Sequence, residues 1–214
     1  MILALACSFL AAAIGLPTFY LNQSGINRNG NPPLVGYGGE LNTVVEWLDR
    51  IADSNTNVPV VKTPAALLAV LRSTPAALDS ITHAYTASDW AARPAAGEWS
   101  ATEILCHMRD VDAEINLPRF ENVSQGVNPF MPGINSDVWA QERGYAKEDG
   151  PTALHQFHAA RGRIIQLLES LDETGWNRPA RHAIFGPTTL MELVSFTTTH
   201  DRNHVQQLWC NPRV

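Results

Sequence analysis

The sequence predicts a mainly α-helical protein, a four-helix bundle with one long crossover, preceded by a small N-terminal segment of α/β-like pattern. Three observations carry this prediction. After residue 62, apolar residues recur at helical spacing in four long stretches, which is typical of amphipathic helices. Two capping boxes mark helix starts. A long stretch containing Asn, Gly and Pro between the second and third helices fits the crossover of such a bundle.

Residues 1–62 carry a different pattern, and we expect a segment separate from the bundle, with a truncated α/β unit as one interpretation. Its first 16 residues are almost all apolar, but they lack the cationic start of a signal peptide. Pro17 interrupts the run short of the ~20 residues of a membrane span. A buried helix is therefore preferred over a targeting segment. The elements expected are a helix Ile2–Ile14, a strand Thr18–Leu21, a loop Asn22–Gly39, a helix Glu40–Ala52 and a strand Val58–Val61.

The first bundle helix is expected to begin after Thr63, with Pro64 in the first turn, where a missing amide hydrogen costs little. It should run to about Tyr85. Pro75 lies inside this stretch and cannot donate the hydrogen bond of a helix interior, so it is predicted to kink or divide the helix.

The second helix begins with the capping box Ser100–Glu103 and is predicted to bend or end at Pro118. The crossover should extend from Asn122 to about Asp149, with a short helix over residues 136–145. The inward-facing positions of the second helix follow the i, i+3, i+4 spacing of a buried face. They are Ile104, His107, Met108, Val111 and Ile115.

Two further helices complete the predicted bundle. The third begins at the Asp-Gly-Pro sequence 149–151 and ends near Leu171. The fourth begins at the capping box Thr189–Glu192, and its histidines continue an i, i+4 row of inward-facing side chains. This row is Phe196, His200, His204 and Leu208.

The histidines of the second and fourth helices form a candidate metal site. His200 and His204 share one helix face, so both imidazoles can bind a single ion. His107 lies on the inward side of the second helix, although a satisfied core histidine is the alternative for it alone. Three imidazoles from two facing helices would leave open coordination positions. Catalytic zinc sites have this arrangement, which also suits nickel or ferrous iron.

Two segments resemble the DinB-like (damage-inducible) superfamily of four-helix-bundle metalloproteins. Residues 96–110, AGEWSATEILCHMRD, are similar to the start of the second helix in that family, and residues 186–208, which contain HDRNH, to its last helix. The resemblance covers about Thr63–Val214. It implies a bundle domain over residues 63–214 in which His107, His200 and His204 hold a divalent metal, zinc first. It also implies kinship with S-transferases that use bacillithiol or mycothiol and with a mycothiol-dependent isomerase.

Two functional classes follow. The first is a metal-dependent thiol S-transferase acting on small electrophiles, in which the metal lowers the pKa of a low-molecular-weight thiol and the thiolate attacks. The second is a non-catalytic, metal-bound binding or interaction module, for which a homodimer is one arrangement. An open metal position beside a pocket would favour the first class. A fourth protein ligand, for instance Asp110 or a neighbouring carboxylate, would favour the second. Asp110 forms an acidic row on the second helix with Glu103 and Glu114.

Composition limits the partners and the compartment. The hydrophobic fraction of 45% and charged fraction of 17% are those of a globular protein, and the net charge of −6 with scattered basic residues argues against a nucleic-acid partner. Cys7, Cys106 and Cys210 form neither a disulfide framework nor a four-cysteine zinc site. We therefore expect the cytoplasm and no membrane span, while the apolar N-terminal run leaves a secreted or anchored form open.

Several other side chains have simpler interpretations. Cys106 points away from His107 and is expected to be a small buried hydrophobe rather than a nucleophile. Asp201 and Arg202 are expected to support the metal ligands or lie on the bundle surface. The histidines at 155 and 158 are expected on a solvated or partly buried face. Trp99, Trp139 and Trp176 are expected to pack at the bundle ends. Trp139 and Tyr145, on the long crossover, could alternatively form the wall of a pocket.

The proposed boundary can be tested by truncation. Because the helical pattern and all three candidate ligands follow Thr63, a protein beginning at Val61 should stay soluble and bind as much metal as the full chain. Metal content and circular dichroism measure this. A folded truncated protein without metal would show that residues 1–62 belong to the site.

Overall fold

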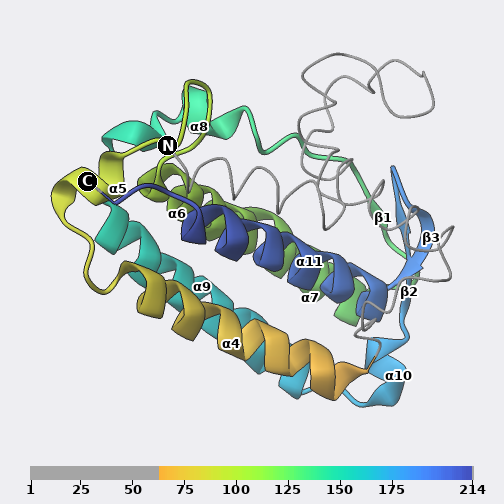
Figure 1. The fold of residues 1–214 in the computed structure, drawn as a ribbon. Helices are drawn as coiled ribbons and strands as arrows, with labels where there is room; N and C mark the ends of the chain where they lie inside the picture. Colours follow the sequence, from red (N-terminus) through yellow and green to blue (C-terminus); the bar gives the residue numbers. More distant parts are fainter. Residues whose placement is uncertain (1–62, 214) are drawn as a thin grey trace, which may run out of the picture.

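The computed structural model describes residues 63–213, and the elements expected within residues 1–62 lie outside that range. The described chain forms a four-helix bundle (Figure 1). Its long helices are α4 (Pro64–Thr82), α6 (Ala101–Asp110) continued by α7 (Leu117–Gln125), α9 (Gly150–Glu169) and α11 (Leu190–Trp209). None of the helices in this part of the chain is long and apolar enough to cross a membrane.

Pro75 was predicted to kink or divide the first helix, and the structure shows that it does not divide it. Helix α4 runs through Pro75 and ends at Thr82 rather than Tyr85. The start is as expected, since the Thr63 hydroxyl accepts from the Ala66 amide at 3.3 Å. A proline at position 75 removes the donor that the Leu71 carbonyl would use in a regular helix. The Arg161 guanidinium of α9 donates to that carbonyl at 3.4 Å instead.

The second helix was predicted to bend or end at Pro118, and the structure shows that the helical run does not end there. The capping box forms as expected, with Ser100 and Glu103 bonding each other's backbone amides. After α6 the chain widens into a π-helical segment, η1 (Val111–Asn116), before α7 begins. The Leu117 amide bonds to the Asp112 carbonyl, five residues back. Pro118 then stands in the first turn of α7, where its missing amide hydrogen is not needed, so it neither ends nor breaks the helical run.

The crossover begins after Gln125, later than expected, and holds a strand that was not predicted, β1 (Phe130–Met131). The helix predicted over residues 136–145 is shorter and divided into α8 (Trp139–Glu142) and the 3-10 turn η2 (Tyr145–Lys147). Two other short helices flank the long ones, α5 (Ala87–Ala91) and α10 (Glu173–Trp176).

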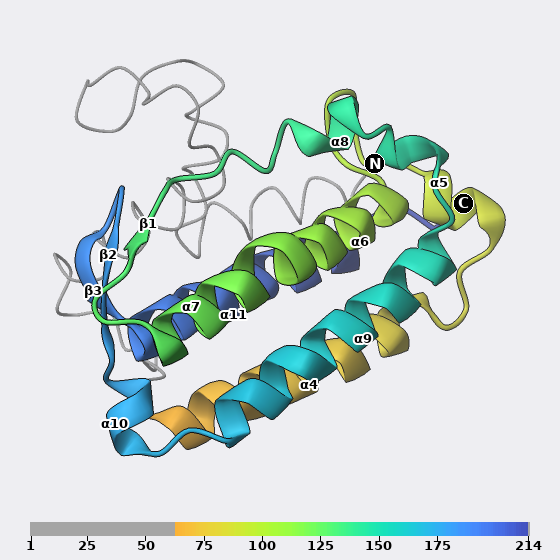
Figure 2. The ribbon, with the colours of Figure 1, turned by 180° about the vertical axis from the view of Figure 1, so that it is seen from behind.

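A three-stranded sheet, which the sequence pattern did not predict, lies at one end of the bundle (Figure 2). Strand β1 pairs in parallel with β2 (Pro179–His182), which pairs antiparallel with β3 (Gly186–Thr189). Gly186 starts β3 with a φ of +71°, a conformation that favours glycine. The sheet lies where α7 ends and α11 begins, at the opposite end of the bundle from α5 and α8 (Figure 2). Thr189 then caps α11 through the predicted box with Glu192.

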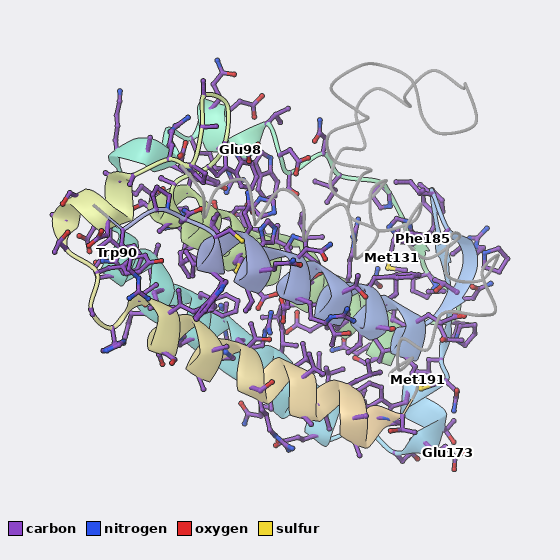
Figure 3. The ribbon with its side chains drawn as sticks, viewed as in Figure 1. Trp90, Glu98, Met131, Glu173, Phe185 and Met191 are labelled. Carbon is purple, nitrogen blue, oxygen red and sulfur yellow. The ribbon has the colours of Figure 1, made fainter. Side chains whose placement is uncertain are left out.

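Side chains fill the space between the helices (Figure 3) and form two apolar clusters. One lies toward the sheet and includes Leu71, Phe120 and Trp176, and the other includes Ile104, Met108 and Phe157. At about 25 cal/mol per Å² of apolar surface removed from water, such burial provides the main stabilisation of the fold.

A buried ion-pair network runs through the bundle. Arg161 of α9 is 1% exposed and donates to Asp112 of η1 at 2.7 Å and to both carboxylate oxygens of Asp201 of α11. The Thr74 hydroxyl of α4 donates to Asp201 at 3.0 Å, and the side-chain amide of Asn116 donates to Asp112 at 2.9 Å. Each buried charge therefore has hydrogen-bonded partners. With its bond to the Leu71 carbonyl, the Arg161 guanidinium contacts α4, η1 and α11.

Replacing Arg161 tests how far the bundle depends on this network. Arg161→Met would leave two buried carboxylates without their cation, a change that costs about 3–5 kcal/mol in comparable cases. Urea unfolding should show this loss. Arg163→Met is the matched control, because Arg163 lies exposed on the same helix. Equal unfolding midpoints for the two variants would refute the assigned role.

Candidate metal centre

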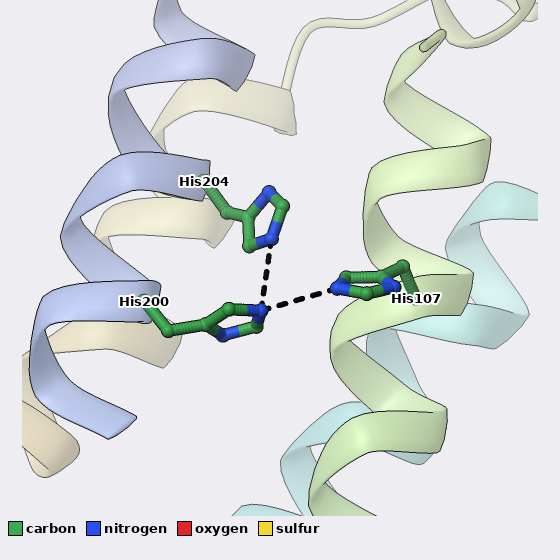
Figure 4. Close-up of side chains that lie close together, drawn as sticks. All are labelled: His107, His200 and His204. Atoms are coloured by element: carbon green, nitrogen blue, oxygen red, sulfur yellow. Dashed lines mark hydrogen bonds between the residues drawn. The ribbon is translucent and has the colours of Figure 1, made fainter. Parts of the chain in front are cut away.

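The structure brings the three predicted histidines together. The Nε2 atom of His200 lies 3.1 Å from Nε2 of His107 and 3.0 Å from Nε2 of His204. The candidate ligand atoms of all three side chains lie within 4.8 Å of one another. Figure 4 shows the rings of α11 turned toward the ring of α6 across the bundle.

Local structure explains this convergence. The four-residue spacing places His200 and His204 one above the other on α11. Asp201, the residue between them that is bound to Arg161, fixes the rotation of α11 about its axis. His107 is 1% exposed because it lies on the inward-facing side of α6, among the other buried residues of that helix.

The hydrogen bonds around the rings suit a bound cation. The Nδ1 atom of His204 donates to Oε1 of Gln207 at 2.9 Å, which leaves the Nε2 lone pair facing the other histidines. Nε2 of His200 has two nitrogen neighbours at about 3 Å. A neutral imidazole nitrogen carries either one proton or one in-plane lone pair, so it cannot bond well to both. A single metal ion could accept all three lone pairs, so the donor set fits one.

The electrostatic surroundings keep the imidazoles neutral. Burial lowers the pKa of His204 to about 3, with a further contribution from His200. Burial and the Arg161 charge lower the pKa of His200 to about 4. The pKa of His107 also lies well below its usual value because of burial and the two other histidines, although the Ser136 backbone acts in the opposite direction. Neutral imidazole is the form that binds metal.

The acidic row of the second helix does not enter this site. Asp110 accepts hydrogen bonds from Arg109, Arg143 and Tyr145, each at 2.6 Å. Glu103 caps its own helix and also pairs with Arg93, and Glu114 pairs with Arg143. Within residues 63–213, the group of side chains close enough to share an ion consists of the three histidines. Asp110 is thus not a fourth ligand in this arrangement.

Trp99 packs against the apolar cluster that includes Ile104 and Phe157, as expected of a residue at the bundle end, and it also contacts candidate metal ligands. Its ring centroid lies 4.8 Å from that of His107 and 6.1 Å from that of His204, nearly parallel to the latter at 12°. The indole therefore forms a wall of the histidine cluster. One signal for this role is visible in the sequence, because Trp99 directly precedes the cap of the helix that carries His107.

The other aromatic candidates do not reach the site. Trp176 is 2% exposed in an apolar cluster, as expected, and Trp139 packs under the Arg143 guanidinium 3.9 Å above its ring. Tyr145 is fully buried and donates to Asp110, so it does not wall a pocket beside the histidines.

The remaining side chains follow the simpler interpretations. Cys106 is buried, and burial raises the pKa of its thiol to about 12, which disfavours a nucleophile. His155 is exposed, and His158 is half-buried on α9, where its Nε2 atom lies 3.3 Å from Asp79. Asp201 is buried in the ion-pair network, whereas Arg202 is exposed.

A pocket adjoins the histidines through His200. Its walls come from η1, α7, α11, the crossover and the turn between β2 and β3, and they are mostly apolar. Phe185 and Phe196 stack against each other there with centroids 4.0 Å apart. The lining residues are Val111, Ile115, Asn116, Arg119, Phe120, Ser136, Phe185, Leu193, Phe196, Thr197 and His200.

Comparisons with known proteins agree with this architecture. The chain is 24% identical over 129 residues to the uncharacterized protein YuaE of Bacillus subtilis strain 168, which covers 54% of this chain and 78% of YuaE. Its fold is similar, with a TM-score of 0.62 and 18% identity, to YfiT from Bacillus subtilis, covering 72% of this chain and 87% of YfiT. YfiT is described as a probable metal-dependent hydrolase with an unusual four-helix bundle topology. The model of the DinB superfamily matches residues 70–208, and the chain therefore belongs to the DinB superfamily.

Proposed function

We propose that this protein is a divalent-metal-dependent thiol S-transferase that acts on small electrophiles, with His107, His200 and His204 as the metal ligands. The observation that carries the proposal is the convergence of three Nε2 atoms beside a largely apolar pocket that shares His200. Three protein nitrogens leave coordination positions for a reactant, as in catalytic zinc sites.

The ligand set favours catalysis over the alternative of a non-catalytic binding module. A structural zinc site is closed by four protein ligands. The carboxylates nearest in sequence to His107 are engaged by arginines instead, as described for Asp110 and Glu103. Zinc is the first expectation for three neutral imidazoles, and nickel or ferrous iron would also suit them.

The chemistry divides between the ion and the pocket. A divalent ion held by the histidines would lower the pKa of a low-molecular-weight thiol and so supply a thiolate near neutral pH. The protein's own residues hold the ring nitrogens neutral and orient them, through Gln207 for His204. The apolar walls around Phe185 and Phe196 would exclude water and hold an electrophile close to the thiolate.

Hydrolysis is the second candidate, because the structural relative YfiT is described as a probable metal-dependent hydrolase. The same open positions would suit water as well as a thiol. Bacillithiol and mycothiol are the thiols proposed, since these are the cosubstrates that the family resemblance implies.

Metal analysis of the purified protein, coupled to thiol-consumption and hydrolysis assays, tests the proposal. We expect about one divalent ion per chain and thiol-dependent loss of a chlorinated aromatic electrophile, with bacillithiol or mycothiol active. Thiol-independent hydrolysis would support the second candidate. Bound metal without turnover of either kind would support the binding module, and absence of bound metal would contradict the site itself.

Metal binding should increase the free energy of unfolding of the protein. A metal that binds only the folded chain adds RT ln(1 + [L]/Kd), which is about 2.7 kcal/mol at a hundredfold excess over Kd. A chelator should therefore lower the Tm of the wild-type protein but not that of His204→Ala. His155→Ala is the control, because His155 is exposed on α9, and it should respond like wild type. Equal chelator responses from wild type and His204→Ala would contradict the assignment.

The pocket should determine the affinity for apolar electrophiles. Phe185→Ala removes a lining ring that stacks on Phe196 and leaves the three candidate ligands unchanged. We expect kcat/KM to fall roughly tenfold, mostly through KM, because such apolar contacts contribute about 1–3 kcal/mol. Metal content should not change.

Phe130→Ala serves as the control for this variant, because Phe130 is an exposed ring of β1 outside the pocket lining. A loss of activity in Phe130→Ala as large as that in Phe185→Ala would contradict the proposed role of the pocket in binding the electrophile.

A further inference from the structure

Trp99 contacts two of the three candidate ligand rings. The His107 ring lies tilted against the indole with centroids 4.8 Å apart, and the His204 ring lies nearly parallel to it at 6.1 Å. These rings come from different helices, α6 and α11. The Trp99 side chain therefore contacts candidate ligands from both of the helices that build the metal site.

The backbone around Trp99 is fixed relative to both helices. Ser100, the next residue, caps α6 through the box with Glu103. Asn211 follows the end of α11. With its side-chain amide oriented to satisfy both neighbours, it donates to the Gln207 carbonyl at 3.1 Å and accepts from the Ala101 amide at 3.0 Å. Trp99 therefore lies where hydrogen bonds from Asn211 connect the end of α11 with the start of α6.

Trp99 and the pocket border different members of the triad. The pocket is lined by His200, whereas the indole contacts His107 and His204 and is not among the lining residues. An aromatic wall on one part of the cluster and a cavity on another give the site a closed and an open side.

We propose that Trp99 is a positioning residue of the metal site, holding the His107 and His204 rings in their metal-binding orientation and leaving the open coordination positions on the pocket side. The inference rests on the proposed metal function. Its physical basis is preorganisation, because a ring already held by packing loses less rotational freedom when the ion binds. A ring face near two imidazoles would also exclude water from around a bound ion.

Trp90 provides a matched control for simple packing. Both tryptophans are partly buried and pack against the same apolar cluster around Ile104 and Phe157. The ring partner of Trp90 is Tyr85, at 5.6 Å, not a histidine. Loss of either indole should therefore destabilise the apoprotein, but only loss of Trp99 should alter the metal site.

Titration of the full-length apoprotein with Co²⁺, followed by its visible absorption bands, tests the proposal. Trp99→Ala should raise the Kd for Co²⁺ about tenfold or more and change the band positions, because the ligand geometry loosens. Trp99→Phe, which keeps an aromatic face, should recover most of the affinity, and Trp90→Ala should bind like wild type. If Trp99→Ala does not fold, Trp99→Leu gives the same comparison while keeping apolar volume.

A Trp99→Ala or Trp99→Leu protein with wild-type Kd and spectrum would overturn the positioning role while leaving the metal site intact. Equal losses in the Trp90 and Trp99 variants would also overturn it, because the effect would then come from packing. Failure of the wild-type protein to bind Co²⁺ would instead contradict the metal site on which the inference rests.

Discussion

The Arg161 guanidinium is the constraint on which the geometry of the bundle depends. It lies almost fully buried on α9 and donates to the Leu71 carbonyl of α4, to Asp112 of η1 and to Asp201 of α11. A buried charge is tolerated only while its partners stay in place. Rotation of α11 or a change of register in η1 would break one of these bonds. Because Asp201 directly follows His200, the same bonds that hold α11 also direct its histidines toward His107.

The network also relates the backbone irregularities of the fold to the site. Pro75 deprives the Leu71 carbonyl of its helical donor, and Arg161 replaces that donor from another helix. The π-helical turn inserts extra backbone after α6, so that Asp112 reaches Arg161 while Val111 and Ile115 line the pocket. π-helical turns are frequent at functional sites.

The sequence predicted those features that depend on local periodicity or on capping. The boxes at Ser100 and Thr189 gave the starts of two helices, and the spacing of His200 and His204 gave a shared face. The three strands were missed because runs of two to four residues are too short to show alternation. Arg161 could not be recognised as buried, since a lone arginine is usually exposed and its partners lie 40 to 90 residues away. Trp99 precedes its helix, so helical periodicity assigned it no face.

The site divides into a part that the bundle fixes and a part that it does not. The candidate metal ligands lie in helix interiors, held by Asp201 and by the cap of α6. Much of the pocket instead comes from η1, from Ser136 of the crossover and from Phe185 in the turn between β2 and β3. Changes in the turn between β2 and β3, which carries Phe185, would alter what the pocket accepts without removing a partner of Arg161 or a candidate metal ligand. One fold and one ligand set are therefore compatible with several reactions, so membership in the DinB superfamily fixes the architecture while the pocket residues must decide the substrate.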